Sequence, residues 1–326
     1  FLIILFNNKN FNYKMTNLTF SGEVNFKSEE NIKNILLRIF LYYSVLSLIF
    51  FFLLNLSGVR LYNSLNLTMT LISNGGFLPS NNLNEIITTN FQKIIIAICF
   101  ILSILNFYLL FNIFNKQILI KKHKEDFYII VLAGFLILLI YFNNFEGLNV
   151  ILSVLSSLAN SGITLIQTDN NLSLYFLLVT IIGGSLISNT SGIKFTRLYI
   201  LLKTTSAEII RLISPNSIIN KTIFNSENKI TDENVKISFL VFISFFLSLF
   251  ILSSLLVIDN IGFESSFKLS ILALTNTVNS EMYSLENLNF TNLLISSKIG
   301  LIIFMIIGKI ELISVFLIFK KIFFKK

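Results

Sequence analysis

The apolar residues of this chain follow one pattern, long–short–long, that recurs three times along the sequence. The stretches are residues 35–56, 62–73 and 91–114, then 127–142, 148–160 and 172–202, then 237–258, 266–277 and 293–319. A helix of about 20 apolar residues is about 30 Å long and crosses a bilayer, whereas about 12 residues reach only about 18 Å. The pattern therefore predicts an all-α integral membrane protein with internal repeats, in which the short helices do not cross.

Each short segment ends in a polar or glycine-containing loop. These loops are residues 73–77 (SNGGF), 161–164 (SGIT) and 278–281 (VNSE). Irregular backbone at membrane depth is tolerated only where protein or a water-filled cavity satisfies its polar groups. The sequence thus favours re-entrant pore helices whose loops line an aqueous path, and the alternative is short amphipathic helices outside the membrane.

The positive charges test this topology. If every short segment returns to its own side, most of the 25 Lys and Arg residues lie on a single side, which the positive-inside rule makes cytoplasmic. Crossing short segments would put the second and fourth clusters on the opposite side from the first. The re-entrant topology also explains the net charge of +8 without any nucleic acid. The residues concerned are Lys9, Lys14, Lys27, Lys33, Arg38, Lys116, Lys121, Lys122, Lys124, Lys194, Arg197, Lys203, Arg211, Lys221, Lys229, Lys236, Lys320, Lys321, Lys325 and Lys326.

The composition argues against enzymatic chemistry. Charged residues make up 13% of the chain, about half the usual share, and hydrophobic residues make up 54%. The single cysteine, Cys99, excludes a disulfide framework and cysteine-based metal sites, and the single histidine, His123, lies among lysines. No glycine-rich phosphate loop follows a strand pattern. We therefore expect no catalytic residue, no cofactor and no nucleotide site in this chain.

Repeated span–pore helix–loop–span units resemble the architecture of potassium channels, whose backbone carbonyls replace the hydration shell of the ion. Several such units on one chain resemble the Trk/Ktr/HKT superfamily of cation transporters, and in particular its bacterial TrkH-like members. The loop SNGGF resembles the second filter loop of the family, and IGKIELISVFLIF (residues 307–319) resembles its closing signature. Residues 181–203 resemble the long helix of its third repeat, with matching positions at Gly183, Gly184, Ser188, Gly192, Lys194 and Arg197.

The resemblance implies a domain organisation, because family members have four repeats around a central ion pore. Residues 1–33 are then the end of the first repeat and a cytoplasmic loop, with FLIILF at the start as the last turns of a truncated helix. Residues 34–125, 126–233 and 234–326 are the second, third and fourth helix–pore helix–loop–helix units.

The resemblance also implies an ion filter in which potassium is held by backbone carbonyls. Gly75 and Gly162 are the expected filter glycines, and the alternative is that both are ordinary turn glycines. In the fourth repeat, Asn279 occupies the position at which the family has Gly. A filter backbone is compatible with Asn there, because Asn tolerates positive φ, and its side chain would weaken selectivity against sodium. The nearby Glu281 either concentrates cations or is a solvated loop residue. The expected filter residues are Asn74, Gly75, Ser161, Gly162, Val278 and Asn279.

A gate is expected below the filter, at the polar interruption of residues 185–191. Ser188, Asn189 and Thr190 suggest unwound backbone facing water, and the alternative is intrahelical packing of these hydroxyls. Lys309 stands where the closing signature of the family has Arg. A charge deep in a membrane costs at least about 2.5–3.5 kcal/mol, so it must face water or a partner. We expect it to oppose the interruption.

These features predict the ion-translocating subunit of a TrkH-like potassium uptake system in the bacterial inner membrane. The resemblance implies a homodimer in the lipid bilayer and a cytoplasmic, nucleotide-binding regulatory subunit, similar to TrkA or KtrA, on the basic face. The alternatives are a transporter of relaxed Na⁺/K⁺ selectivity and a degenerate, non-conducting membrane protein with a scaffold or regulatory role.

Overall fold

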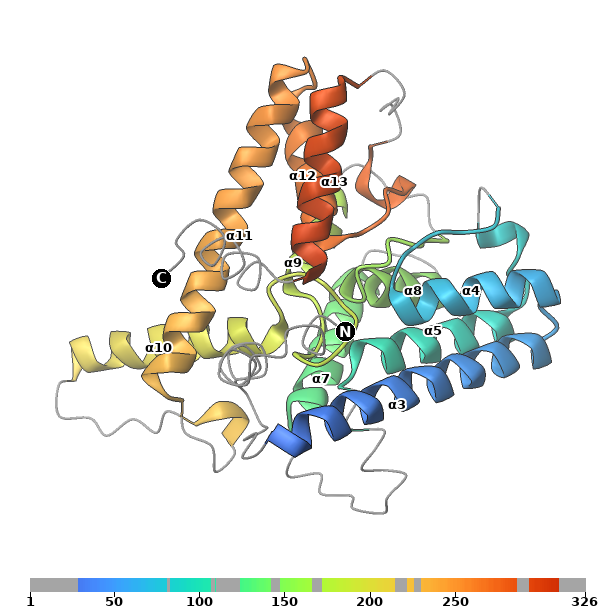
Figure 1. Cartoon of the computed structure of the whole chain (residues 1–326), viewed down its shortest axis with the longest axis horizontal. Coiled ribbons are helices and arrows are strands. Elements are labelled where there is room, and N and C mark those ends of the chain that lie inside the picture. The colour runs from blue at the N-terminus through green and yellow to red at the C-terminus, as the bar shows by residue number, and fades with distance from the viewer. Residues whose placement is uncertain are drawn as a thin grey trace.

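The computed structural model describes residues 29–80, 83–106, 109, 124–141, 147–165, 172–214, 222–225, 230–285 and 293–310. These residues form α-helices joined by loops and short 3-10 turns, as Figure 1 shows, so the all-α class predicted from the sequence is confirmed. The α-helices are α3 (Glu29–Leu56), α4 (Leu61–Ser73), α5 (Asn90–Ile104), α7 (Lys124–Tyr141), α8 (Gly147–Leu158), α9 (Ser173–Ile182), α10 (Phe195–Ile213), α11 (Asp232–Ile258), α12 (Phe263–Thr275) and α13 (Ile295–Ile310).

The short apolar segments are half-length helices. Helices α4, α8 and α12 have 13, 12 and 13 residues, which corresponds to about 18–20 Å each. Each packs against the helices that precede and follow it in the sequence, so α3–α4–α5, α7–α8–α9 and α11–α12–α13 form three packed units. Helix α9, with 10 residues, is shorter than the 12-residue α8 that it follows.

The units are joined in the same way. Helix α5 of the first unit packs against α8 of the second, and α9 of the second packs against α12 of the third. The second long helix of one unit therefore covers the half-length helix of the next. Among the described residues, no half-length helix of a following unit packs against α13. Likewise, no last helix of a preceding unit packs against α4.

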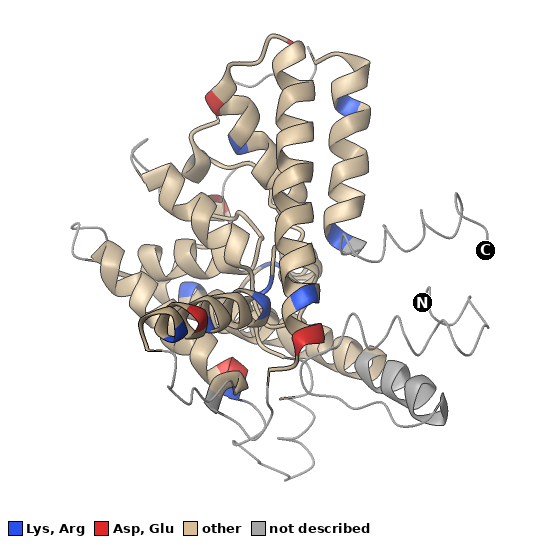
Figure 2. Ribbon diagram, turned by 90° about the vertical axis from the view of Figure 1, so that its left-hand side faces the viewer, with Lys and Arg blue, Asp and Glu red and all other residues tan. Residues whose placement is uncertain are grey.

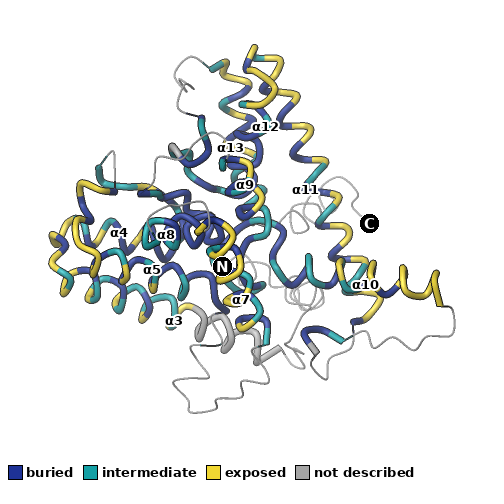
Figure 3. Tube along the Cα trace, turned by 180° about the vertical axis from the view of Figure 1, so that it is seen from behind, coloured by how far each residue is buried: buried dark blue, intermediate teal, exposed yellow. Residues whose placement is uncertain are grey.

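Helix α11 shows the surface expected of a membrane-spanning helix. It has 27 residues, and among the described helices it alone is long and apolar enough to cross a bilayer by itself. One side packs inward through Leu249, Leu252 and Leu256, while Phe239 and Phe250 on other sides are more than half exposed. Figure 3 shows this alternation along the outer helices, with the most deeply buried backbone where the units meet.

Most charged residues of the described helices lie away from the middle of the fold, and Lys194 and Lys309 at the interruption are exceptions. In Figure 2 the charged residues gather mainly around the beginnings of α7, α10 and α11, with a smaller group at the far ends of α12 and α13. Uncharged helix between the two groups fits a molecule whose middle layer lies in lipid.

Two predicted long stretches do not form single helices. Residues 107–108 and 110–114 of the first stretch lie outside the described residues. The stretch at 91–114 forms α5 only as far as Ile104, because Leu105 is extended and the Asn106 amide is bound by the Asp126 carboxylate (2.8 Å). The stretch at 172–202 becomes α9 and α10, and the interruption between them runs from Gly183 to Lys194, longer than the predicted 185–191.

A glycine sets the close approach of α13 to α12. A Cβ atom at Gly308 would overlap the carbonyl oxygen of Leu274, whereas a Cβ atom at Gly134 in α7 would meet no atom within 4 Å. We expect Gly308→Ala to lower the free energy of unfolding by about 1–3 kcal/mol, as overpacking does. The matched variant Gly134→Ala should leave it unchanged or slightly raised, because Ala favours helix. Thermal unfolding in detergent measures both, and equal stability of the two variants would contradict the close contact.

Candidate functional site

The half-length helices end in the same backbone geometry. Each is followed by an asparagine in the left-handed region, with φ of 53° at Asn74, 61° at Asn160 and 52° at Asn276. Asparagine is the residue other than glycine that adopts this conformation most readily. The next residue then donates its amide to the carbonyl five positions earlier, and the pairs are Gly75–Thr70, Ser161–Ser156 and Thr277–Leu272, at 3.0, 3.0 and 2.9 Å.

This common geometry sets the register of the three loops. The second residue after each asparagine is Gly76, Gly162 or Val278, and both glycines have positive φ, of 73° and 77°. The predicted equivalence of Gly75, Gly162 and Asn279 is therefore wrong by one residue at two of the three positions. Gly75 corresponds to Ser161 and Thr277, and Asn279 lies one residue beyond the position equivalent to Gly162.

The three loops are in direct contact. A Cβ atom at Gly76 would overlap the Ser161 carbonyl oxygen and lie 2.9 Å from Cβ of Val278. A Cβ atom at Gly162 would overlap the Val278 carbonyl oxygen. Only glycine fits at these two positions, because of both the φ angle and the space.

Val278 departs from the pattern of the other two loops. It lacks the positive φ of Gly76 and Gly162, and its amide donates to the Ser161 carbonyl oxygen at 3.4 Å. Its side chain lies against Gly76. One carbonyl of the second loop is therefore occupied by the backbone of the third.

The asparagines also connect the loops to the long helices. The Asn160 amide nitrogen donates to the Thr180 carbonyl in α9 (2.7 Å), and its oxygen accepts from the Ser191 amide (3.1 Å). In the third unit, Asn276 donates to the Met305 carbonyl in α13 (2.7 Å). The Asn74 side chain is buried and has no hydrogen-bond partner among the described residues.

The interruption between α9 and α10 contacts the ends of these helices through Ser191 and Asn189. The Lys194 ammonium binds the backbone of the interruption. It donates to the carbonyl oxygens of Ser188 (3.1 Å) and Thr190. The Thr190 hydroxyl accepts from the Gly184 amide at 3.0 Å. Ser188, Asn189 and Thr190, the residues expected to form a gate, therefore lie in one compact, non-helical loop.

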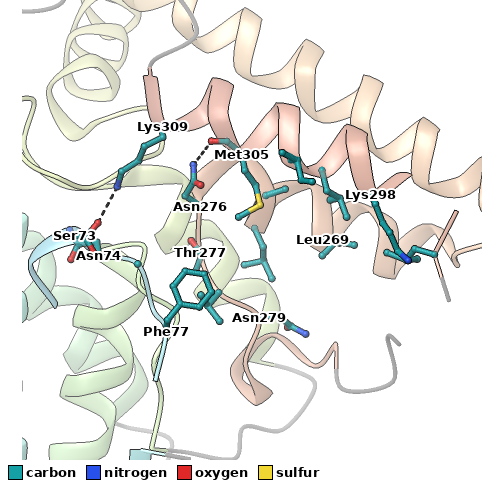
Figure 4. Close-up of a pocket in the computed structure, with 17 residues that line it drawn as sticks. Ser73, Asn74, Phe77, Leu269, Asn276, Thr277, Asn279, Lys298, Met305 and Lys309 are labelled. Carbon is teal, nitrogen blue, oxygen red and sulfur yellow. Dashed lines mark hydrogen bonds between the residues drawn. The ribbon is translucent and has the colours of Figure 1, made fainter. Parts of the chain in front are cut away.

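Lys309 reaches this loop from α13. Its ammonium donates to the Asn189 carbonyl oxygen (2.9 Å) and to the Ser73 carbonyl oxygen at the end of α4 (3.1 Å). The Asn189 side chain donates in turn to the Ile72 carbonyl oxygen (2.6 Å). Figure 4 shows Lys309 pointing toward Ser73, beside Asn74. The contact between Lys309 and the interruption is the one expected from the sequence.

Two cavities meet at Lys309. The larger, of about 760 Å³, lies between the α4 loop and the third unit and is lined mainly by aliphatic side chains of α12 and α13. The smaller, of about 140 Å³, lies at the interruption, with lining residues that include Ser188, Ser191 and Lys194. Lys309 and its loop contacts therefore lie between a space beside the loops that follow α4 and α12 and a polar space at the interruption.

The electrostatics of the converging helix ends favour a cation. A helix C-terminus carries a partial negative charge, and α4, α8 and α12 have no basic residue in the last turn to neutralise it. The ends of α4 and α12 line the larger cavity, and the loop after α8 contacts the loop after α12. The Lys309 ammonium on the Ser73 carbonyl is itself a cation bound at such an end.

Sequence reasoning missed Gly76, the anchoring asparagines and the carboxylate of Glu125, which binds the interruption. A signal for the register was present in the sequence. Each short segment ends in an asparagine followed by a small or branched residue, as SNGG, ANSG and TNTV. Aligning the repeats on this asparagine, in place of the glycine motif of one loop, yields the register of the structure. The partners of Glu125 lie about 60 and 70 residues away in the sequence, with no pattern to indicate them.

No family model matches this chain. An uncharacterized cation transporter from Methanocaldococcus jannaschii is 28% identical over 304 residues, which cover 88% of this chain and 59% of that protein. The crystal structure of the potassium transporter TrkH from Vibrio parahaemolyticus matches with a TM-score of 0.79 and 18% identity, covering 91% of this chain and 65% of that chain. The chain thus spans less than two thirds of the length of either protein. The fold implied by the sequence resemblance is confirmed.

The asparagine anchors provide a matched pair of variants. Substitution by glycine keeps the left-handed conformation and removes only the side chain. We expect Asn160→Gly to lower the free energy of unfolding by about 1–3 kcal/mol, because it leaves the Thr180 carbonyl and the Ser191 amide unpaired. Asn74→Gly removes no hydrogen bond of the described structure and should change stability much less. Unfolding in detergent compares the two, and a larger loss in Asn74→Gly would refute the anchoring role of Asn160.

Proposed function

From the TrkH fold of this chain, we propose that it is the ion-translocating part of a monovalent-cation transporter with potassium as its substrate. One observation carries the proposal. Three half-length helices end at mutually contacting loops, and a lysine-held interruption of a long helix contacts the ends of these helices and separates two cavities. Unpaired backbone at membrane depth is expensive, so such an arrangement suits a path along which ions replace the missing partners.

The proposed filter consists of the backbone carbonyls that follow the three pore helices. It includes the residues expected from the sequence, in the corrected register, so that Gly76 and Val278 take the positions first expected for Gly75 and Asn279. Carbonyl oxygens at helix C-termini bind cations without any carboxylate, because the helix dipole adds to the dipole of each carbonyl.

The larger cavity supports a pore completed by a fourth unit. Each described junction joins a long helix to the half-length helix of the next unit. Helix α13 and helix α4 are the two surfaces left over by this rule, and they face each other across the 760 Å³ cavity. We propose that a further helix–pore helix–helix unit packs against these two surfaces, outside the cavity, and supplies the fourth set of carbonyls beside it.

Val278 favours a second candidate function, a transporter of relaxed Na⁺/K⁺ selectivity or a non-conducting membrane protein. A valine between two glycine loops breaks the equivalence of the carbonyl ring, and its amide occupies the Ser161 carbonyl. Ion flux through the unmodified protein separates these candidates. A selective potassium transporter has a high K⁺/Na⁺ flux ratio, a transporter of relaxed selectivity has a low one, and a non-conducting protein has no flux.

The proposed setting is the inner (plasma) membrane, with the basic residues toward the cytoplasm. There the protein would act as a homodimer with a nucleotide-binding regulatory subunit of the TrkA or KtrA kind on its basic face. The charges that gather at the beginnings of α7, α10 and α11 support this orientation.

The two neighbouring glycines of the first loop test the proposed filter. We expect the full-length protein in proteoliposomes to carry rubidium, as a tracer for potassium, and Gly76→Ala to abolish this flux. The reason is that a Cβ atom at Gly76 meets backbone and is strained by positive φ, whereas at Gly75 it meets only the Ser73 hydroxyl (3.1 Å) and the Phe77 ring. Gly75→Ala should therefore retain most of the flux. A parent without flux contradicts the proposed function, and equal flux in both variants contradicts the filter register.

Lys309 tests the proposed gate. Two unit charges about 4 Å apart interact by about 4 kcal/mol at an effective dielectric of about 20, enough to slow a passing cation strongly. Lys309→Met should therefore raise basal rubidium flux roughly tenfold, while Lys309→Arg stays near the parent. The control Lys236→Met removes an exposed lysine near the start of α11 and should have no effect. If Lys309→Met conducts no faster than the parent at matched expression, Lys309 is not part of a gate.

A further inference from the structure

Two adjacent carboxylates at the beginning of α7 are buried. Glu125 is 4% exposed and Asp126 is 1% exposed, although Glu and Asp are almost never fully buried unless they are paired. Neither is part of the proposed filter or of the loop that Lys309 contacts. Their hydrogen bonds indicate what they do.

Glu125 binds a residue inside the interruption and a residue of the helix that follows it. One carboxylate oxygen of Glu125 accepts from the Leu186 amide (2.8 Å), within the loop, and from the Thr196 hydroxyl, in the first turn of α10. A single side chain therefore joins the inside of the interruption to the first turn of α10.

Asp126 connects the same turn of α7 to the end of α5. Its carboxylate accepts a hydrogen bond from the backbone amide of Asn106 at 2.8 Å. The end of α5 in turn contacts the interruption directly, because the Ile104 carbonyl oxygen accepts from the Ser185 amide (3.1 Å). A Cβ atom at Gly184 would lie 2.8 Å from the same carbonyl oxygen, so no side chain fits between them. The end of α5, the start of α7 and the interruption form one hydrogen-bonded junction.

We propose that Glu125 is a positioning residue that holds the interruption closed beneath the pore loops, while Asp126 fixes the turn of α7 that carries it. The loop is then held from two sides, by Glu125 at Leu186 and by Lys309 at Asn189. That the loop acts as a gate rests on the proposed function. That Glu125 holds the loop in place does not depend on that function.

The position of Glu125 makes it a route from the cytoplasmic side to the gate. It is the second residue of α7 and follows directly on the lysine-rich residues 121–124, which the charge pattern assigns to the cytoplasm. A displacement of the first turn of α7 would move the Glu125 carboxylate and, through its two hydrogen bonds, the loop. A partner that binds the basic face would therefore change the gate without touching the pore.

The test measures the loop itself as well as ion flux. In the full-length protein with Cys99→Ser, a Ser188→Cys reporter on the loop is labelled by a small charged thiol reagent added from the cytoplasmic side. Glu125→Ala leaves a buried amide and a buried hydroxyl unpaired, so we expect the labelling rate and the basal rubidium flux to rise roughly tenfold. Glu125→Gln keeps an oxygen that accepts both bonds and should restore both rates to within about twofold of the parent.

Thr196→Val tests the same junction from the other side. It removes the hydroxyl donor at nearly constant volume and should raise the labelling rate, and combined with Glu125→Ala it should add nothing further, because both changes break the same bond. The matched control is Glu208→Ala, which removes an exposed carboxylate of α10 that pairs with Arg211 (3.2 Å), and it should leave both rates unchanged.

The outcomes separate this inference from the proposed function. Unchanged labelling in both Glu125→Ala and Thr196→Val overturns the positioning role, whatever the flux. If Glu125→Ala does not fold, an unchanged rate in Thr196→Val overturns it alone. Raised labelling in a protein whose parent and variants carry no rubidium supports the positioning role and refutes the proposed transport.

Discussion

Backbone groups that are left unpaired where a helix ends inside a membrane must find partners within the protein, and this requirement organises the whole fold. Each half-length helix satisfies this requirement in the same way. An asparagine in the left-handed conformation follows the helix, and the backbone amide of the next residue donates to the carbonyl five residues earlier. The side chains of Asn160 and Asn276 also donate hydrogen bonds to backbone carbonyls of the following helices, α9 and α13. The helix ends are thereby held at a fixed depth, and the loops that follow them can meet.

Close contact between the loops limits which residues can form them. Gly76 and Gly162 adopt positive φ and have backbone of a neighbouring loop where a Cβ atom would be. Val278 meets the same space with a side chain and an ordinary φ, and its amide takes one carbonyl of the neighbouring loop. The three loops therefore share a framework but present different chemistry to an ion, and the difference concentrates at one residue.

The interruption of the long helix depends on side chains from several elements. Lys194 binds carbonyls of the loop from within, Lys309 binds the loop from α13, and Glu125 of α7 binds Leu186 in the loop and Thr196 just after it. Cationic donors serve the loop carbonyls and an acidic acceptor serves its amide, so the polar backbone has partners of the right kind on each side. A loop held by three separable contacts can be released by changing one of them, which is the property that a gate requires.

The sequence by itself determined the helical class, the half-length helices and the interrupted long helix, because these depend on local runs of apolar residues whose length is compared with a bilayer. It also indicated the contact of Lys309 with the interruption, since a deep charge needs a polar partner. Only the tertiary structure decided that Gly76 and Val278, and not Gly75 and Asn279, are equivalent to Gly162. The asparagine at the end of each short segment carries this register in the sequence, but it is the φ angles and the contacts between the loops that identify the asparagine, and not the glycine motif, as the equivalent position. The role of Glu125 was invisible, because a carboxylate near a lysine-rich loop looks solvated until packing buries it against its partners.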